Sequence, residues 1–279
     1  MRVEDKNIDV LTVDGFGDEW NKFQQEKLSH DERQKVFNDY FNIFPLDKLS
    51  QDAIGADIGC GSGRWAILIA PKIGHLHLID ASIEALAVAQ KNLAALSNCS
   101  FHCASVDDMP IADESLDFAY SLGVLHHVPN TRKAIESVAK KIKPKGLFLI
   151  YLYYRFDNRP KWFQILWHLS DLLRKVICRL PFSLRYLVSQ VLAVCIYWPL
   201  ARTALLLEKI YKPLPNWPLF YYRNKSFYVL RTDALDRFGT RLEQRFTKIE
   251  IEAMLINAGF ENIQFSNNAP FWCVLGIKK

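Results

Sequence analysis

Residues 56–65 read Ala-Asp-Ile-Gly-Cys-Gly-Ser-Gly-Arg-Trp, a short apolar run that ends in the alternating glycines Gly59, Gly61 and Gly63. A helix-like pattern follows, and a second apolar run over 75–79 ends in Asp80. Glycine allows a backbone to approach a ligand closely, and the start of a helix offers unpaired N–H groups. A carboxylate that closes the next strand can accept bonds from two ribose hydroxyls. The stretch therefore predicts a nucleoside cofactor held over the ends of two parallel strands.

Apolar runs and helical stretches alternate from about residue 53 to residue 151. The runs end near Ile58, Ile79, Phe101, Leu122 and Tyr151. This rhythm is typical of βαβ units and predicts an α/β fold with a mostly parallel, doubly wound sheet. Right-handed crossovers bring the carboxyl ends of the strands to one edge, where ligands bind in such sheets.

The end of the chain fits the same fold. Thr247 and Glu250 form a capping-box pattern that opens a helix over 248–258, and Gly259 ends it. The segments 260–266 and 270–279 are expected to be a closing pair of strands.

Four segments in order resemble the class I methyltransferases that use S-adenosylmethionine (SAM), of the kind called methyltransferase type 11. They are the D-x-G-x-G-x-G run, Ser105–Pro110, Leu116–Val128 and Lys141–Ile150. The resemblance covers roughly residues 52–151, about a third of the chain. It implies a Rossmann-like sheet of seven strands, the last of them antiparallel, and SAM as the cofactor. Dinucleotide sites prefer G-x-G-x-x-G, so the glycine spacing disfavours an NAD-dependent oxidoreductase, which would share the fold.

The resemblance also implies roles for single residues in the first half of the site. Asp57 would anchor the glycine loop or reach the methionine amine of the cofactor through water. Asp80 would bind the ribose, and Ala81 and Ser82 would line the adenine. A carboxylate that only caps backbone N–H groups is compatible with the place of Asp57.

The second half of the site is expected around the adenine and the methionine portion of the cofactor. Many relatives carry Asp where this chain has Ser105. We therefore expect Val106, through its backbone N–H, and Asp107 to contact the adenine. Leu122, at the end of the fourth strand, is expected near the methionine portion.

His126 and His127 follow the fourth strand and lie at the edge where the cofactor is expected. An imidazole titrates near neutrality, so either residue is a candidate general base for a hydroxyl or amine acceptor. Many relatives carry a similar pair in which the second histidine serves structure, so a structural role is the alternative. The motif after this strand is not N/D-P-P-Y/F, which disfavours amide or adenine N-methylation of nucleic acid of that type.

Methyl transfer from a sulfonium requires neither a covalent nucleophile nor a metal, because holding acceptor and methyl group in line supplies about 7–11 kcal/mol. The six cysteines show no C-x-x-C pair, and Cys99 and Cys103 have no matching partner pair at zinc spacing. We therefore expect no metal site and reduced thiols. Residues 1–6 are mostly charged and no apolar signal segment follows, so we expect a cytoplasmic protein.

Residues 1–50 are expected to form a mostly helical N-terminal segment that precedes the SAM-binding core over 51–151. Aromatic residues recur through this segment at Phe16, Trp20, Phe23, Phe37, Tyr40, Phe41 and Phe44. In related methyltransferases such a segment often lies over the cofactor, and we expect Trp20 and Phe23 nearest the site. Packing in a core is the alternative for these rings.

Residues 152–246 are a predicted helical insertion, after which 247–279 complete the core. Between Tyr151 and Phe246 sixteen Lys and Arg face six Asp and Glu, although the whole chain has a net charge of +5. Aliphatic residues recur at helical spacing over 162–176. The uncharged run 186–201 of the insertion is shorter than the roughly twenty residues of a membrane span, so no transmembrane segment is predicted.

Aromatic and basic residues alternate in the insertion, among them Trp198, Tyr211, Lys212, Trp217 and Arg223. Such a mixture suits an anionic membrane surface or RNA. Its many aliphatic residues favour lipid, or a lipophilic small molecule, over nucleic acid. An ordinary helical cap with its own core is the alternative.

Together these observations predict a SAM-dependent methyltransferase that acts on a small, lipophilic or anionic acceptor, with the insertion as acceptor lid. Three rivals stay open: an RNA methyltransferase that uses the basic insertion, an NAD-dependent oxidoreductase, and a SAM-fold protein that binds cofactor without turnover. The sequence leaves the oligomeric state and the methylated atom open.

Overall fold

The computed structural model describes residues 7–23, 29–210 and 216–279. It consists of two compact units. The sheet unit comprises Met1–Gln25, Gln34–Arg155 and Leu242–Lys279, and the helical unit comprises Glu26–Arg33 and Phe156–Arg241. Apart from Glu26–Arg33, the helical unit falls inside the expected insertion. Tyr211 and Lys212 lie outside the described residues.

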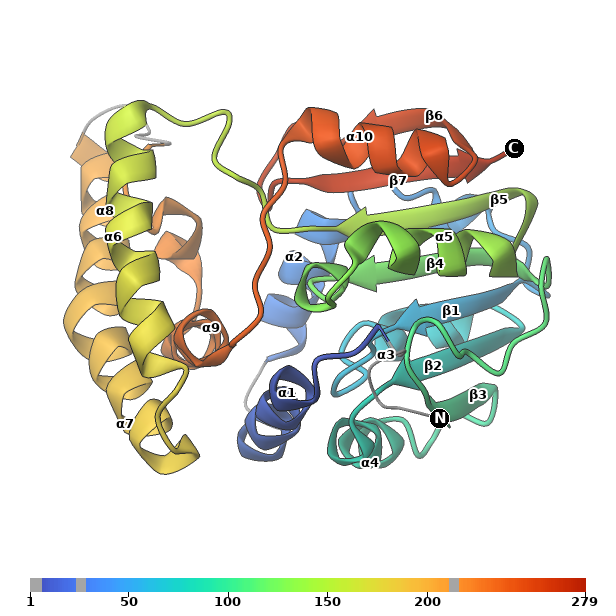
Figure 1. The fold of residues 1–279 in the computed structure, drawn as a ribbon, viewed down its shortest axis with the longest axis horizontal. Helices are drawn as coiled ribbons and strands as arrows, with labels where there is room; N and C mark the ends of the chain where they lie inside the picture. The colour runs from blue at the N-terminus through green and yellow to red at the C-terminus, as the bar shows by residue number, and fades with distance from the viewer. Residues whose placement is uncertain (1–6, 24–28, 211–215) are drawn as a thin grey trace. The chain divides into compact units, whose positions relative to one another are not determined.

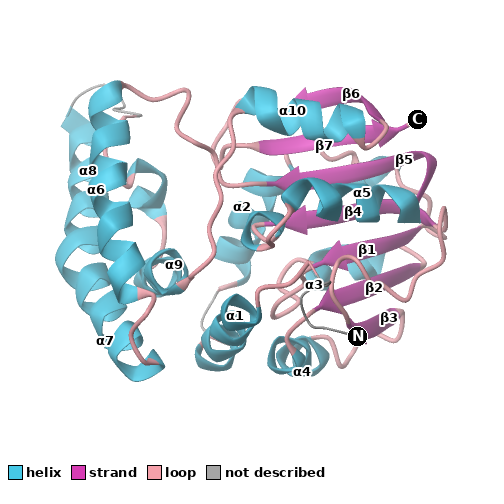
Figure 2. Cartoon of the chain, viewed as in Figure 1, coloured by secondary structure: helices cyan, strands magenta, loops and turns pink. Residues whose placement is uncertain are grey.

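The sheet unit contains a seven-stranded sheet in the described part of the chain, in the order β3-β2-β1-β4-β5-β7-β6. Figure 1 shows the strands side by side, and Figure 2 shows the helices that accompany them. The neighbours from β3 to β5 are parallel, and β7 is antiparallel to both β5 and β6. The strands are β1 (Ile54–Ile58), β2 (His75–Asp80), β3 (Cys99–Cys103), β4 (Leu116–Leu122), β5 (Ile142–Tyr151), β6 (Phe260–Phe265) and β7 (Cys273–Lys278). The doubly wound, mostly parallel sheet with an inserted last strand is confirmed.

Helices and hydrophobic cores cover both faces of this sheet. Along β5 the side chains of Phe148 and Ile150 belong to one core cluster and that of Leu149 to the other, as the two-residue period of a strand requires. The first cluster takes in residues of α5 (Thr131–Lys141) and α10 (Lys248–Asn257). The second takes in residues of α2 (His30–Phe41), α3 (Ala66–Ile69) and α4 (Ile83–Asn92).

Local signals set the ends of these elements. The Thr247 hydroxyl accepts from the Glu250 N–H while the Glu250 carboxylate accepts from the Thr247 N–H, so the predicted capping box is present at the start of α10. Gly259 follows that helix with φ of +87°, a backbone conformation that favours glycine.

The helical unit has a core of its own. Its helices are α6 (Lys161–Ile177), α7 (Phe182–Leu192), a π-helical turn (Ala193–Tyr197), α8 (Trp198–Ile210) and α9 (Phe227–Gly239). Both α6 and α7 pack against α9. The buried residues between them are Ile177, Ala193, Tyr197, Ala201, Leu230, Ala234 and Phe238.

One long helix runs from Phe182 to Ile210, and this corrects the expectation that no segment is long enough to span a membrane. The helix has 29 residues, is apolar enough by composition to cross a bilayer, and 22% of its most apolar window is buried. The expectation counted only the uncharged run 186–201, which contains Pro199, a residue that lacks an N–H and crowds the preceding turn. The wider π-helical turn at 193–197 comes just before this proline and lets the helix continue. Length and composition alone do not make the helix a membrane span.

Candidate functional site

The glycine loop after β1 is fastened to the end of β2. The N–H groups of Gly59 and Cys60 both donate to the carbonyl of Ile79, at 2.7 and 3.0 Å. The N–H of Gly61 donates to Oδ2 of Asp80 at 2.8 Å. The unpaired N–H groups are expected at the start of the following helix, whereas these three loop amides bond to β2. The loop turns back along β2, and the Gly61 amide orients the Asp80 carboxylate.

The three glycines have a conformational reason and a packing reason. Gly59, Gly61 and Gly63 have φ of +75°, +52° and +71°, in the left-handed region that side chains disfavour. A Cβ at these positions would lie 2.4 Å from Val124, 2.8 Å from Trp20 and 2.8 Å from Leu93, respectively. The loop is therefore closely covered by protein at each of its three glycines.

Asp80 is the last residue of β2. Both of its carboxylate oxygens accept backbone hydrogen bonds, and the carboxylate can accept more. Oδ1 accepts from the Ser82 N–H at 2.9 Å, and Oδ2 accepts from Gly61. Burial raises the pKa of this carboxyl, while the backbone N–H bonds oppose the rise. A carboxylate has about four acceptor positions, and the backbone N–H groups of Ser82, Gly61 and Ala81 do not fill all of them. The remaining acceptor capacity fits a ribose hydroxyl.

Ala81 and Ser82 continue from Asp80 into α4. The Ser82 hydroxyl accepts from the Ala85 N–H and caps the helix, and it donates to Glu84. The Ala81 carbonyl accepts a weak bond from the Cys103 thiol at 3.8 Å. The Ser82 side chain therefore serves the helix start, and its backbone N–H serves Asp80.

Asp57 is buried beneath the glycine loop near the end of β1. Its Oδ2 accepts from the Tyr120 hydroxyl at 3.0 Å. Burial raises the pKa of Asp57 to about 8, and the Tyr120 bond partly opposes that rise. A cation beside this carboxyl would favour its ionised form. The position suits a ligand that brings positive charge.

The side chains of the expected adenine segment, Ser105 to Asp107, point in different directions. The Asp107 carboxylate pairs with Lys133 at 2.8 Å and accepts from Ser137 at 3.2 Å, so it is turned to α5. Val106 is buried in the core on that face of the sheet. The Ser105 hydroxyl is buried and has no hydrogen-bond partner among the described residues. Sequence reasoning passed over Ser105 because relatives carry Asp there, and that same departure was the signal that could have found it.

The carboxyl end of β4 carries the two histidines and Leu122, which is buried in the core at the strand's last position. His126 is buried, and its ring lies 3.8 Å from that of Tyr153 and 3.9 Å from that of His127. Neither ring nitrogen of His126 has a hydrogen-bond partner among the described residues. Burial, followed by the charges of His127 and Arg245, lowers the pKa of His126 well below 6.5. His126 is therefore neutral at physiological pH.

His127 is held by the segment that precedes α10. Its Nδ1 lies 2.6 Å from the carbonyl of Leu242. Since a carbonyl only accepts, Nδ1 carries the proton, which fixes the tautomer. Phe16 of α1 packs on the other side, with ring centroids 5.0 Å apart. These contacts hold the His127 ring in place at this end of the sheet.

The helix α1 (Val10–Lys22) covers the glycine loop. Trp20 lies over Gly61, and the Arg64 guanidinium lies 5.7 Å from the Trp20 ring. The helix also packs along α4. Phe23 is buried just past the helix end. Trp20 thus contacts the glycine loop, as expected for this segment.

The charged residues before α10 form ion pairs within each unit. Arg245 pairs with the buried Glu243 at 2.7 Å and lies over Tyr153 in the sheet unit. In the helical unit Arg237 lies 3.7 Å from Asp171. Among the described residues no group of three or more His, Cys, Asp or Glu is arranged to hold a metal ion.

Together, this sheet order and a carboxylate presented at the end of β2 define a Rossmann-like domain with a nucleoside site at the carboxyl edge of its sheet. Residues 56–150 match the family described as methyltransferase domain. These residues form a class I SAM-dependent methyltransferase domain, and its cofactor is SAM.

Similar proteins agree on the domain and differ in their acceptors. An uncharacterized methyltransferase, YcgJ of Bacillus subtilis, is 30% identical over 100 residues, which are 35% of this chain and 40% of that protein. Phosphoethanolamine N-methyltransferase 2 of Caenorhabditis elegans is 29% identical over 127 residues, 44% of this chain and 28% of that protein. Sterol 4-C-methyltransferase strm-1 of the same organism is 27% identical over 133 residues, 47% of this chain and 39% of that protein. The chain thus spans less than half the length of these relatives.

A solved structure shows the same fold. The crystal structure of YcgJ has a TM-score of 0.51 with this chain at 17% identity, and the alignment covers 85% of this chain and 70% of that one.

Proposed function

We propose that the whole chain is a SAM-dependent methyltransferase whose acceptor is a small molecule with a lipophilic or an anionic part. The observation that carries the proposal is the Asp80 carboxylate, held by the N–H groups of Gly61 and Ser82 at the carboxyl edge of a methyltransferase domain. When bound, SAM supplies an activated methyl group.

In this proposal the residues of the chain bind the cofactor and orient it. Asp80 accepts from the ribose hydroxyls, and Ser105 offers its unpartnered hydroxyl to the adenine. Asp57 gives up its proton as a cationic ligand arrives, because positive charge lowers a carboxyl pKa that burial has raised. The Trp20 indole, which lies over Gly61, excludes water from the loop.

In this proposal the methyl acceptor binds at the carboxyl end of β4. There the ring nitrogens of His126 form no hydrogen bond with any described residue. Its lowered pKa makes it a weak base. His126 is therefore better suited to orient a methyl acceptor by a hydrogen bond than to remove a proton from it.

Two features support a lipophilic or anionic acceptor. The relatives are named for phosphoethanolamine and for a sterol, so the domain type is used with both kinds of molecule. The segment from Tyr151 to Phe246 is rich in aliphatic residues and carries sixteen Lys and Arg against six Asp and Glu. A cytoplasmic location is part of the proposal, and it is supported by six cysteines that are all free thiols.

The test is calorimetry of the full chain with S-adenosylhomocysteine and with NADH, followed by methyl-transfer assays on a sterol, a quinone precursor, phosphoethanolamine and RNA. We expect binding of S-adenosylhomocysteine, no binding of NADH, and turnover with a small acceptor. NADH binding in place of S-adenosylhomocysteine would overturn the proposal. Turnover of RNA alone, with an affinity that falls steeply with salt, would favour the nucleic-acid alternative.

A further inference from the structure

The helix α6 has its charged face inward and its apolar face outward. The side chains of Asp171 and Arg174 are 10% and 5% exposed and joined by an ion pair of 2.7 Å. On the opposite face Ile165, Leu172 and Val176 are 61%, 60% and 63% exposed. A helix on a water-facing surface shows the reverse arrangement. A helix face with several large apolar side chains exposed marks a surface that binds a partner or a membrane.

Hydrogen bonds and ion pairs hold the inward polar face of α6 in place. Arg174 donates to the carbonyls of Thr240 and Arg241 as well as to Asp171. Lys175 also pairs with Asp171, at 3.0 Å. These partners hold α6 in this rotation, so the leucines cannot turn inward without leaving buried charges unpaired.

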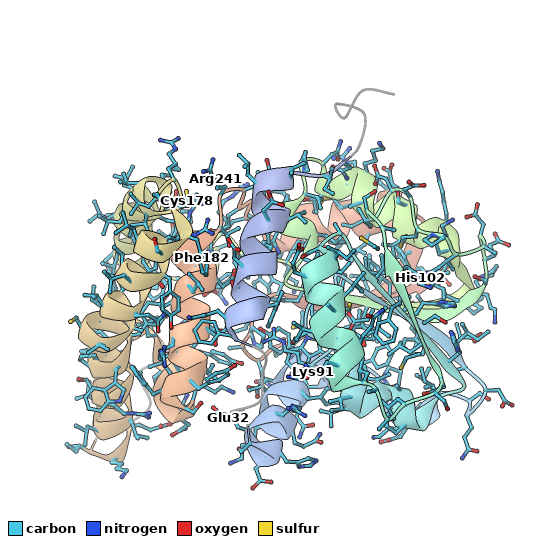
Figure 3. The ribbon with its side chains drawn as sticks, turned by 90° about the horizontal axis from the view of Figure 1, so that it is seen from below. Glu32, Lys91, His102, Cys178, Phe182 and Arg241 are labelled. Atoms are coloured by element: carbon cyan, nitrogen blue, oxygen red, sulfur yellow. The ribbon has the colours of Figure 1, made fainter. Side chains whose placement is uncertain are left out.

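The long helix over 182–210 buries the core residues Ala193, Tyr197 and Ala201, and it also directs two arginines to buried partners. Its Arg185 donates to the carbonyl of Gly239, and Arg202 donates to the carbonyls of Arg223 and Lys225. Its other face carries further exposed aliphatic and aromatic side chains, namely Leu184, Leu187, Val191, Val194, Ile196, Trp198, Leu206 and Ile210. Figures 1 and 3 draw α6, α7 and α8 on one side of α9, and Figure 3 labels Cys178 and Phe182 at the turn between α6 and α7. We call these exposed faces of α6 and α7–α8 the apolar face.

Exposed cations lie at the ends of these helices. Lys161 begins α6, Arg179 follows its end, and Lys209 lies in the last turn of α8. Trp162 follows Lys161 in the first turn of α6, Trp198 lies within the long helix, and each is about half exposed. Lysine, arginine and tryptophan around an aliphatic surface match the headgroup region of a bilayer, where cations meet anionic lipid and indole rings are favoured.

We propose that the apolar face is a docking surface for an anionic lipid bilayer, and that the helices lie in the plane of one leaflet. The long helix has enough residues to cross a bilayer. Glu208 and Tyr186 of this helix bond to Arg223, which precedes α9, and to Arg231 of α9. Crossing would draw those charges into hydrocarbon, so the helix rests at the interface. The proposal concerns the helical unit and does not depend on methyl transfer.

The experiment is sedimentation of the full chain with phosphatidylcholine vesicles and with vesicles that also contain phosphatidylglycerol, at low salt. The test variant is Leu172→Glu with Val191→Glu, and the control is Ile249→Glu, which changes an exposed isoleucine of α10 in the sheet unit. Circular dichroism checks that each variant is folded. We expect binding to the anionic vesicles, at least a roughly tenfold loss of partitioning in the test variant, and no loss in the control.

Three outcomes would overturn the proposal. One is no sedimentation with anionic vesicles. The second is a dimer in solution that the test variant dissociates while vesicle binding is absent, since a second copy would then cover the apolar face. The third concerns the depth of insertion, measured by quenching of tryptophan fluorescence with brominated lipids. Stronger quenching by bromine at the bilayer centre than by bromine near the headgroups would contradict the in-plane placement.

Discussion

The indole of Trp20 lies directly over the backbone of Gly61. A Cβ added to Gly61 would come within 2.8 Å of the Trp20 ring, and Gly61 has φ of +52°. The contact joins the N-terminal helix to the loop that orients Asp80. The cover over the cofactor loop is therefore part of the same packing unit as the sheet.

Gly61→Ala is expected to lower the free energy of unfolding by about 2 kcal/mol or more, from backbone strain plus the clash with Trp20. In a Trp20→Ala background the cost should fall by about 1 kcal/mol, because only the strain remains. Urea denaturation of the four proteins of this cycle measures the coupling. Strictly additive effects would show that the indole does not rest on this glycine.

Asp80→Asn should weaken S-adenosylhomocysteine binding by roughly 10- to 100-fold, because a charge-assisted bond to a ribose hydroxyl is lost. Calorimetry gives the affinity, and the thermal transition shows whether the fold is kept. The exposed Asp113, which pairs with Lys141, provides the control Asp113→Asn. Unchanged affinity in Asp80→Asn would place the ribose elsewhere.

Asp57→Asn is expected to change the pH dependence of stability. The unfolded carboxyl ionises near 3.8, whereas the folded one keeps its proton until about pH 8. The folded state then binds more protons between these values, so the wild type loses stability as pH rises from 5 to 8, by up to about 4 kcal/mol from this group. The variant should lack this loss. If the two proteins change in stability by the same amount between pH 5 and pH 8 in urea denaturation, the raised pKa of Asp57 is refuted.

His126→Leu tests the opposite side of the pH scale. The pKa of folded His126 lies well below 6.5, so the unfolded chain takes up a proton first as the pH falls. The wild type should therefore lose about 1 kcal/mol more than the variant between pH 7.5 and pH 5.5. Chemical denaturation at both values measures this difference. Methyl transfer by the same variant, at unchanged cofactor affinity, would remove His126 from the acceptor site.

Arg174→Met is expected to destabilise the helical unit by about 3 kcal/mol, because Asp171 and two carbonyls lose their buried partner. Lys175→Met is the matched control. It contacts the same carboxylate from an exposed position, so its loss should cost no more than about 1 kcal/mol. Equal effects of the two changes would contradict the inward orientation of the charged face.

Much of the sheet unit follows from the sequence because its signals are local. The two-residue period of the strands, the glycine turn, the acid that closes β2 and the Thr247 capping box each depend on residues a few positions apart. Right-handed crossovers bring the carboxyl ends of the strands to one edge, and the resemblance to class I methyltransferases implies the seven strands. These features predicted the fold, the cofactor class and the edge of the sheet where the site lies.

Only the tertiary structure decided how side chains are shared between elements. It directs the Gly61 N–H to Asp80, turns Asp107 to Lys133 of α5, and leaves the Ser105 hydroxyl without a partner among the described residues. It also rotates α6 so that Asp171 and Arg174 are buried while its leucines face outward. Helical spacing shows that an apolar stripe exists, but which stripe is covered depends on the partners that each face meets, and those partners come from distant parts of the chain.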